Sequence, residues 1–155
     1  ARLRVAGRDA MNARTRERTG VVADAVHDMY AAYGDPVRFD EHLHPDITIW
    51  ESDQPGEMLR LPELDRLRGQ RYEAGRSGAP RPRLVVEDLL VDRWSHVAAV
   101  ARYVLRARDE TGDTTFRVTD VWDLGPGQPR IVHHHAELVM PASTAGRAEG
   151  APDAG

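Results

Sequence analysis

The sequence contains no cysteine and no lysine, and it has no long run of apolar residues. The lack of cysteine excludes disulfides, thiolate metal ligands and a cysteine nucleophile. No apolar stretch approaches the roughly 20 residues that span a bilayer, so we expect no membrane partner. The N-terminal region also lacks the apolar core of a signal peptide, and we therefore expect a cytoplasmic protein.

The composition is that of a globular domain. The chain has 155 residues, of which 41% are hydrophobic, and this is enough for one core. A formal charge of -4 gives no basic face for phosphates, so we expect no nucleic-acid partner. We expect a disordered lead-in over residues 1–8, one domain over residues 9–140 and a disordered, small and polar tail over residues 141–155.

The stretch from Asp113 to Met140 organises the domain. It predicts two long strands, because β-branched and aromatic residues fill both arms and the turn residues LGPGQP separate them. Alternation along each arm gives one apolar row, which we expect to face the core. The row comprises Phe116, Val118, Trp122 and Leu124 on the first arm, and Val132, Ala136, Leu138 and Met140 on the second.

Two titratable residues, Asp120 and His134, interrupt this apolar row. A core-facing charge must be paired, neutralised or open to a cavity. Asp120 is then either a protonated hydrogen-bond donor in a pocket or a carboxylate paired with an arginine. His134 is either a catalytic histidine or a satisfied core residue. Both residues are the first candidates for a functional site.

The rest of the chain predicts helices followed by strands. An apolar stripe predicts a long helix over about residues 9–33, carried by Val22, Val26, Met29, Tyr30 and Tyr33. We expect a short helix over residues 36–43, a strand over 47–51, a helix over about 61–74, and strands over 83–92 and 96–108. This order is α+β, and we expect a cone-shaped, curved antiparallel sheet wrapped around the long N-terminal helix.

The closing hairpin, RVTDVW followed by a glycine turn and RIVHHHAEL, resembles that of small SnoaL-like domains of the nuclear-transport-factor-2-like superfamily. The association domain of calcium/calmodulin-dependent kinase II ends in a similar hairpin. The segments AAYGD and HLHPDITIWES resemble the family's first helix end and first strand, so the likeness covers about residues 20–140. It implies a cystatin-like α+β barrel, a fold shared by isomerases, cyclases, binding modules and oligomerisation domains.

The resemblance to ketosteroid isomerases also implies a catalytic set. The position of that family's catalytic tyrosine matches His27, the position of its general base matches Glu51, and the position of its oxyanion-binding aspartate matches Asp120. Only the last residue is identical. Glu51 could otherwise be an exposed carboxylate at a strand end, and His27 an ordinary helix histidine.

Two further groups of residues have alternative interpretations. His133, His135 and Glu137 share a strand face and could ligate a metal, but we expect them opposite the cavity and predict no metal. Aromatic and apolar residues could line a pocket for a small hydrophobic molecule, or be ordinary core. These are Tyr30, Trp50, Tyr103, Val118 and Trp122.

Two functions fit these features. The first is a small-molecule isomerase or cyclase without a cofactor, which acts on a hydrophobic carbonyl compound with Glu51 as base and Asp120 with a histidine as acid or oxyanion donor. The second is a non-catalytic ligand-binding or dimerisation domain. In either case we expect a homodimer through the outer sheet face, because that face carries several aliphatic residues. They are Val100, Val104, Val121, Ile131 and Val139.

Overall fold

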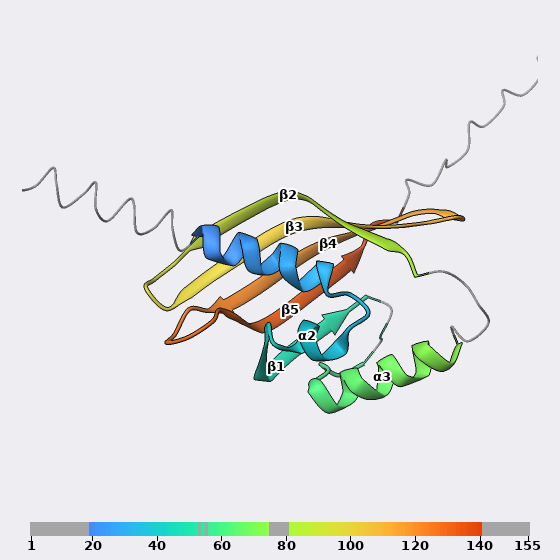
Figure 1. Ribbon diagram of the computed structural model, residues 1–155, viewed down its shortest axis with the longest axis horizontal. Helices are drawn as coiled ribbons and strands as arrows, with labels where there is room; N and C mark the ends of the chain where they lie inside the picture. The colour runs from blue at the N-terminus through green and yellow to red at the C-terminus, as the bar shows by residue number, and fades with distance from the viewer. Residues whose placement is uncertain (1–18, 53, 55, 75–80, 141–155) are drawn as a thin grey trace, which may run out of the picture.

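The computed structural model describes residues 19–52, 54, 56–74 and 81–140, and its elements follow an α+β order (Figure 1). An N-terminal helix, described over residues 19–31, precedes α2 (Pro36–Asp40), β1 (Leu43–Glu51) and α3 (Leu61–Ala74). Four strands then complete the fold: β2 (Arg83–Arg93), β3 (Ala98–Asp109), β4 (Gly112–Asp123) and β5 (Arg130–Leu138). The expected lead-in, the first half of the long helix and the expected tail lie outside the described residues.

The N-terminal helix buries its apolar stripe as the periodicity predicts. Val22, Val26 and Met29 are at most 1% exposed, whereas Tyr33 lies beyond the helix and is 49% exposed. Gly34 ends this segment with a φ of 107°, in the region that favours glycine. The Arg81 guanidinium donates to the Gly34 carbonyl at 3.0 Å, so it caps the chain where the helix stops.

The sheet has five strands in the order β1-β5-β4-β3-β2. Neighbours from β2 to β5 are antiparallel, as expected, whereas β1 lies parallel to β5, which corrects the expected antiparallel sheet at that one edge. β1 follows two helices that return the chain to the starting end of β5, and this sets the parallel pairing. The sheet is curved and open, since β1 and β2 are its edges and do not pair to close a barrel.

A β-bulge in β5 changes which residues face the core. Val121 pairs with His133 but Trp122 pairs with Ile131, so Val132 is an extra residue on β5. Ile131 therefore lies on the inner face and is fully buried, which corrects its expected place on the outer face. Met140 was expected in the inner row, but it follows the end of β5 and is 72% exposed.

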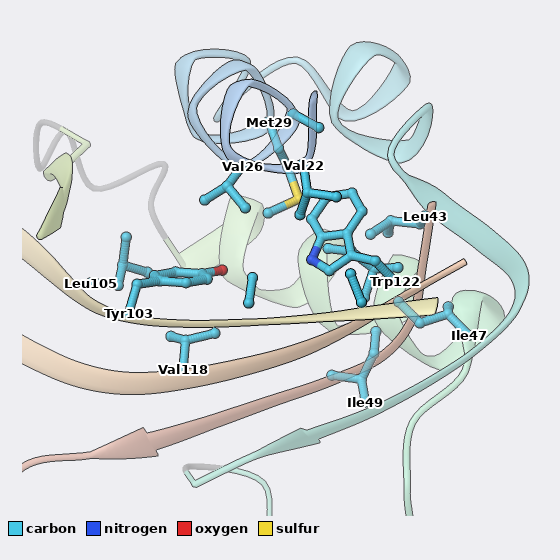
Figure 2. Close-up of a cluster of buried hydrophobic side chains, with 14 of the residues drawn as sticks. Val22, Val26, Met29, Leu43, Ile47, Ile49, Tyr103, Leu105, Val118 and Trp122 are labelled. Atoms are coloured by element: carbon cyan, nitrogen blue, oxygen red, sulfur yellow. The ribbon is translucent and has the colours of Figure 1, made fainter. Parts of the chain in front are cut away.

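The core lies between the N-terminal helix and the inner face of the sheet (Figure 2). Trp122 is fully buried there and packs among side chains from the helix and from β1. Small residues on β3, Ala99 and Ala101, leave room for this large ring on the neighbouring strand. The inner row predicted for β4 is confirmed at Val118, Trp122 and Leu124.

Candidate functional site

Asp120 is the centre of a hydrogen-bonded chain inside the core. It lies on the inner face of β4, opposite Ala101 of β3 and His134 of β5, and it is fully buried. The Tyr103 hydroxyl donates to Asp120 Oδ2 at 2.6 Å, and His134 Nδ1 lies 2.7 Å from Asp120 Oδ1. The hydroxyls of Tyr30 and Tyr103 are 2.9 Å apart. The N-terminal helix and three strands thus contribute to one network.

The positions of the protons in this chain follow from its partners. Tyr103 gives its one proton to Asp120, so Tyr30 must be the donor to Tyr103. We assign His134 Nδ1 as the donor to the other carboxylate oxygen, the arrangement in which a carboxylate accepts at both of its oxygens. His134 Nε2 is the second ring nitrogen, on the side of the imidazole away from this contact. The His134 side chain is 18% exposed, whereas Asp120 has no exposed surface.

The network changes the proton affinities of its members. Burial lowers the pKa of His134, but the charge of Asp120, the hydrogen bond to it and the charge of Glu51 outweigh burial and raise this pKa above 6.5. Burial and the charge of Asp120 raise the pKa of Tyr103 and of Tyr30. The raised pKa of His134 favours its charged form, whose Nε2–H can donate, and the raised pKa values of both tyrosines favour their neutral forms.

Glu51 ends β1 on the same face as His134. Ile49 pairs with His134 and Glu51 pairs with Ala136, so the two titratable side chains are diagonal neighbours on parallel strands. Glu51 is half-buried, and its Oε2 accepts a hydrogen bond of 2.8 Å from Arg71 Nη2 of α3. A carboxylate and an imidazole thus lie on neighbouring strands at this edge of the core.

Of the expected catalytic residues, the structure brings Asp120, His134 and Glu51 together. His27 is exposed on the N-terminal helix, and Tyr30 is the residue of that helix that joins the network. Tyr30 and Tyr103, expected only as pocket lining, supply hydrogen bonds. Their participation depends on the register of β3 against β4 and on the helix docking over it, neither of which shows in the local pattern.

The other residues expected to line a pocket lie on both faces of the sheet. Val118 and Trp122 are buried in the core, and no partner within the described residues accepts from the Trp122 indole N–H. Trp50 lies on the outer face and is 48% exposed. Its ring is edge-on to the imidazole rings of His133 and His135, with ring centroids 5.9 and 5.8 Å apart. A shallow open hollow beside it is lined by Thr48, Trp50, Gly56, Glu57, Met58 and Arg60.

The outer-face histidines do not form a metal centre in the described part of the chain. No group of three histidine, aspartate or glutamate side chains is placed there to hold an ion. His133 Nδ1 lies 2.7 Å from Thr48 Oγ1, and Glu137 pairs with Arg117 at 3.1 Å. No helix in the described ranges is long and apolar enough to cross a bilayer.

Comparisons with solved structures find this fold in several proteins. The hub of calcium/calmodulin-dependent protein kinase II from S. rosetta is 15% identical, with a TM-score of 0.63 over 77% of this chain and 95% of that one. A nuclear-transport-factor-2-like protein from Cytophaga hutchinsonii is 21% identical, with a TM-score of 0.60 over 77% and 97%. A Parabacteroides distasonis protein provisionally described as a ketosteroid isomerase is 19% identical, with a TM-score of 0.59 over 77% and 86%.

No family model and no curated protein sequence matches the chain. The structural likeness nevertheless defines the class of fold. The protein has the cystatin-like α+β fold of nuclear-transport-factor-2-like proteins, with an open curved sheet against an N-terminal helix. The expected fold is therefore confirmed, except that the sheet does not close into a barrel.

Proposed function

We propose that the protein binds a small hydrophobic carbonyl compound and moves a proton within it, as a SnoaL-like isomerase or cyclase does. The observation that carries this proposal is the 2.7 Å contact between Asp120 Oδ1 and His134 Nδ1, which fixes the imidazole with Nε2 turned away from its partner. A buried carboxylate that orients a histidine in this way sets its tautomer and stabilises its charged form.

The roles follow from the two neighbouring groups. Glu51 takes a proton from the carbon next to the carbonyl, and the C–H electron pair forms a carbon–carbon double bond. The carbonyl π electrons move to oxygen, which accepts the proton from His134 Nε2. In an isomerisation, Glu51 then returns its proton to another carbon, and the oxygen gives its proton back to Nε2. Asp120 is a positioning residue, because both of its oxygens are engaged within the core.

The surroundings suit a hydrophobic ligand. Half-buried apolar side chains pack around the core on the same face of the sheet as Glu51 and His134. They include Tyr30, Leu84, Val86, Phe116 and Ala136. Apolar side chains around a few convergent polar groups match the lining that small-molecule sites use.

Deuterium exchange into a model ketone tests this proposal. The wild-type protein in heavy water should exchange the α-protons of 2-tetralone faster than buffer alone, as followed by proton NMR. Glu51→Gln and His134→Gln should each lower the rate by about 10²-fold or more, and His27→Gln should leave it unchanged because His27 is exposed on the helix. Exchange that is independent of both Glu51 and His134 would overturn the proposal.

A second candidate function is a non-catalytic dimerisation domain built on the outer face of the sheet. The specific observation is Trp50, a large apolar side chain that is 48% exposed between two imidazole rings. Kinase hub domains share this fold. A second copy of the chain that covers Trp50, His133 and His135 would bury an aromatic anchor of the kind that dominates interfaces.

A further inference from the structure

An ion pair joins α3 to the proposed general base. Arg71 Nη2 lies 2.8 Å from Glu51 Oε2, and the two side chains are 48% and 20% exposed. Arg68, one turn earlier on α3, has a different role: it is held by Asp40 at 2.8 Å and by Asp65 at 3.3 Å, over the Phe39 ring. Arg68 thus holds α3 against α2, whereas Arg71 contacts Glu51, the proposed general base.

Two pairs of titratable side chains lie at this edge. His134 pairs with Asp120, and Arg71 pairs with Glu51. The Glu51 charge reaches the network, because it raises the pKa of both His134 and Tyr30. In this state Glu51 Oε2 accepts a hydrogen bond from the guanidinium, which competes with a substrate proton for that oxygen.

The ligand that opens this pair at least cost is an anion. A neutral ketone that displaces Glu51 from Arg71 offers the guanidinium no charge in exchange, whereas a ligand carboxylate replaces the carboxylate of Glu51 with another carboxylate. For a partly exposed pair the exchange is close to neutral in free energy. A carboxylate bound to Arg71 would lie beside Glu51, and the repulsion between the two like charges would favour rotation of the Glu51 side chain away from Arg71.

We propose that the natural substrate is a hydrophobic carbonyl compound that carries a carboxylate, and that Arg71 binds this carboxylate and thereby releases Glu51 as the base. The inference rests on the proposed function, since it assigns Glu51 a catalytic role. It makes Arg71 the residue that selects anionic over neutral substrates.

Calorimetric titration with two matched probes tests the inference. The probes are 2-naphthoate and 2-acetonaphthone, which share a ring system and differ in charge. The wild-type protein should bind 2-naphthoate at least about tenfold more tightly than the ketone, and Arg71→Leu should remove this preference. Arg66→Leu is the matched control, because Arg66 is 67% exposed on the same helix and pairs with Glu63.

Glu51→Gln gives a prediction of opposite sign. This variant removes the internal competitor for Arg71, so 2-naphthoate should bind more tightly to it than to the wild type, by about threefold or more. A structural ion pair with no ligand role would give no such gain. The inference is overturned if 2-naphthoate shows no preference over the ketone, if Arg71→Leu binds it as well as Arg66→Leu, or if Glu51→Gln binds it no better.

The exchange of 2-tetralone separates this inference from the proposed function. If the wild type exchanges the ketone through Glu51 and His134 while 2-naphthoate shows no preference, only the anionic substrate class is wrong. If 2-naphthoate behaves as expected but no ketone exchanges, Arg71 binds anions at a site without this chemistry. In that case the proposed function fails, and with it the claim that Arg71 releases a base.

Discussion

Asp120 Oδ1 and His134 Nδ1 lie 2.7 Å apart across paired positions of β4 and β5, with the carboxylate fully buried and the imidazole 18% exposed. The hydrogen bond thus joins a fully buried carboxylate to an imidazole that is partly exposed at the edge of the core. The buried partner cannot meet a ligand, so its effect on a reaction must pass through the histidine. In the function proposed above, folding and proton transfer depend on the same contact.

Replacing Asp120 by leucine should destabilise the fold. The substitution leaves the Tyr103 hydroxyl and the His134 imidazole without an acceptor in the core, at an expected cost of about 3–5 kcal/mol. Asp120→Asn keeps the size and one acceptor oxygen, so the expected loss is about 1–3 kcal/mol. Chemical denaturation measures both. Glu137→Leu, at an outer-face residue that is 55% exposed, is the control and should change stability by about 0.5 kcal/mol or less.

An Asp120→Leu variant as stable as the wild type would show that the carboxylate is not needed by its partners. Asp120 would then be a core polar group without a structural role, and the derived proton positions would be wrong.

The two tyrosines should differ in their contributions to stability. Tyr103→Phe removes the donor to the buried carboxylate and the acceptor of Tyr30, so we expect a loss of about 1.5–3 kcal/mol. Tyr30→Phe removes only the terminal donor of the chain, and the expected loss is about 0.5–1.5 kcal/mol. The urea midpoints of the two variants show which substitution lowers the stability more. A larger loss for Tyr30→Phe would reverse the inferred direction of the hydrogen bonds.

Stability should also depend on pH through His134. The pKa of His134 is raised in the folded protein, so its contribution to stability is complete below 6.5, its ordinary value, and is lost as pH rises through the raised folded pKa. Between these two values the loss is about 1.4 kcal/mol per pH unit. The difference between wild type and His134→Gln in denaturant midpoint, measured from mildly acidic to mildly alkaline pH, isolates this residue.

His133 also makes the stability depend on pH, so the prediction concerns the difference between wild type and His134→Gln and not the wild type alone. Burial, and then the charges of His134 and His135, lower the pKa of His133, so it contributes a pH dependence of opposite sign. The effects of burial and of His135 are present in both proteins, and this part of the contribution cancels in the difference. A difference that stays constant with pH would contradict the raised pKa of His134.

The sequence was most informative where side chains alternate regularly. The inner rows of β3 and β4, the buried stripe of the N-terminal helix and the inward position of Asp120 all follow from periodicity. The order of elements also predicted the α+β class. These features depend on local pattern, which a single chain displays directly.

Features that depend on distant pairing could not be predicted in the same way. The extra residue at Val132 exchanges the faces of Ile131 and its neighbours, and its local sequence is an uninterrupted strand pattern. The parallel pairing of β1 with β5 depends on how two helices return the chain. Arg71 reaches Glu51 from 20 residues away, through the placement of α3. Tertiary packing decides each of these.

Trp50 should be central to any self-association. If the outer face is a dimer interface, Trp50→Glu should convert a dimer to a monomer in light scattering at micromolar concentration, since a central aromatic anchor contributes about 2 kcal/mol or more. Trp94→Glu is the control, because Trp94 is 77% exposed between β2 and β3, away from β1 and β5. A wild-type monomer, or a dimer that Trp94→Glu disrupts and Trp50→Glu does not, would exclude this interface.

Titration of the histidine ring protons by NMR tests the Asp120–His134 pair most directly. The His134 resonance, assigned by its loss in His134→Gln, should titrate with a pKa above 6.5 in the wild type. In Asp120→Asn the attraction of the carboxylate is gone and burial remains, so the pKa of His134 should fall below that value. A wild-type pKa of His134 at or below 6.5, or one that Asp120→Asn leaves unchanged, would contradict the account.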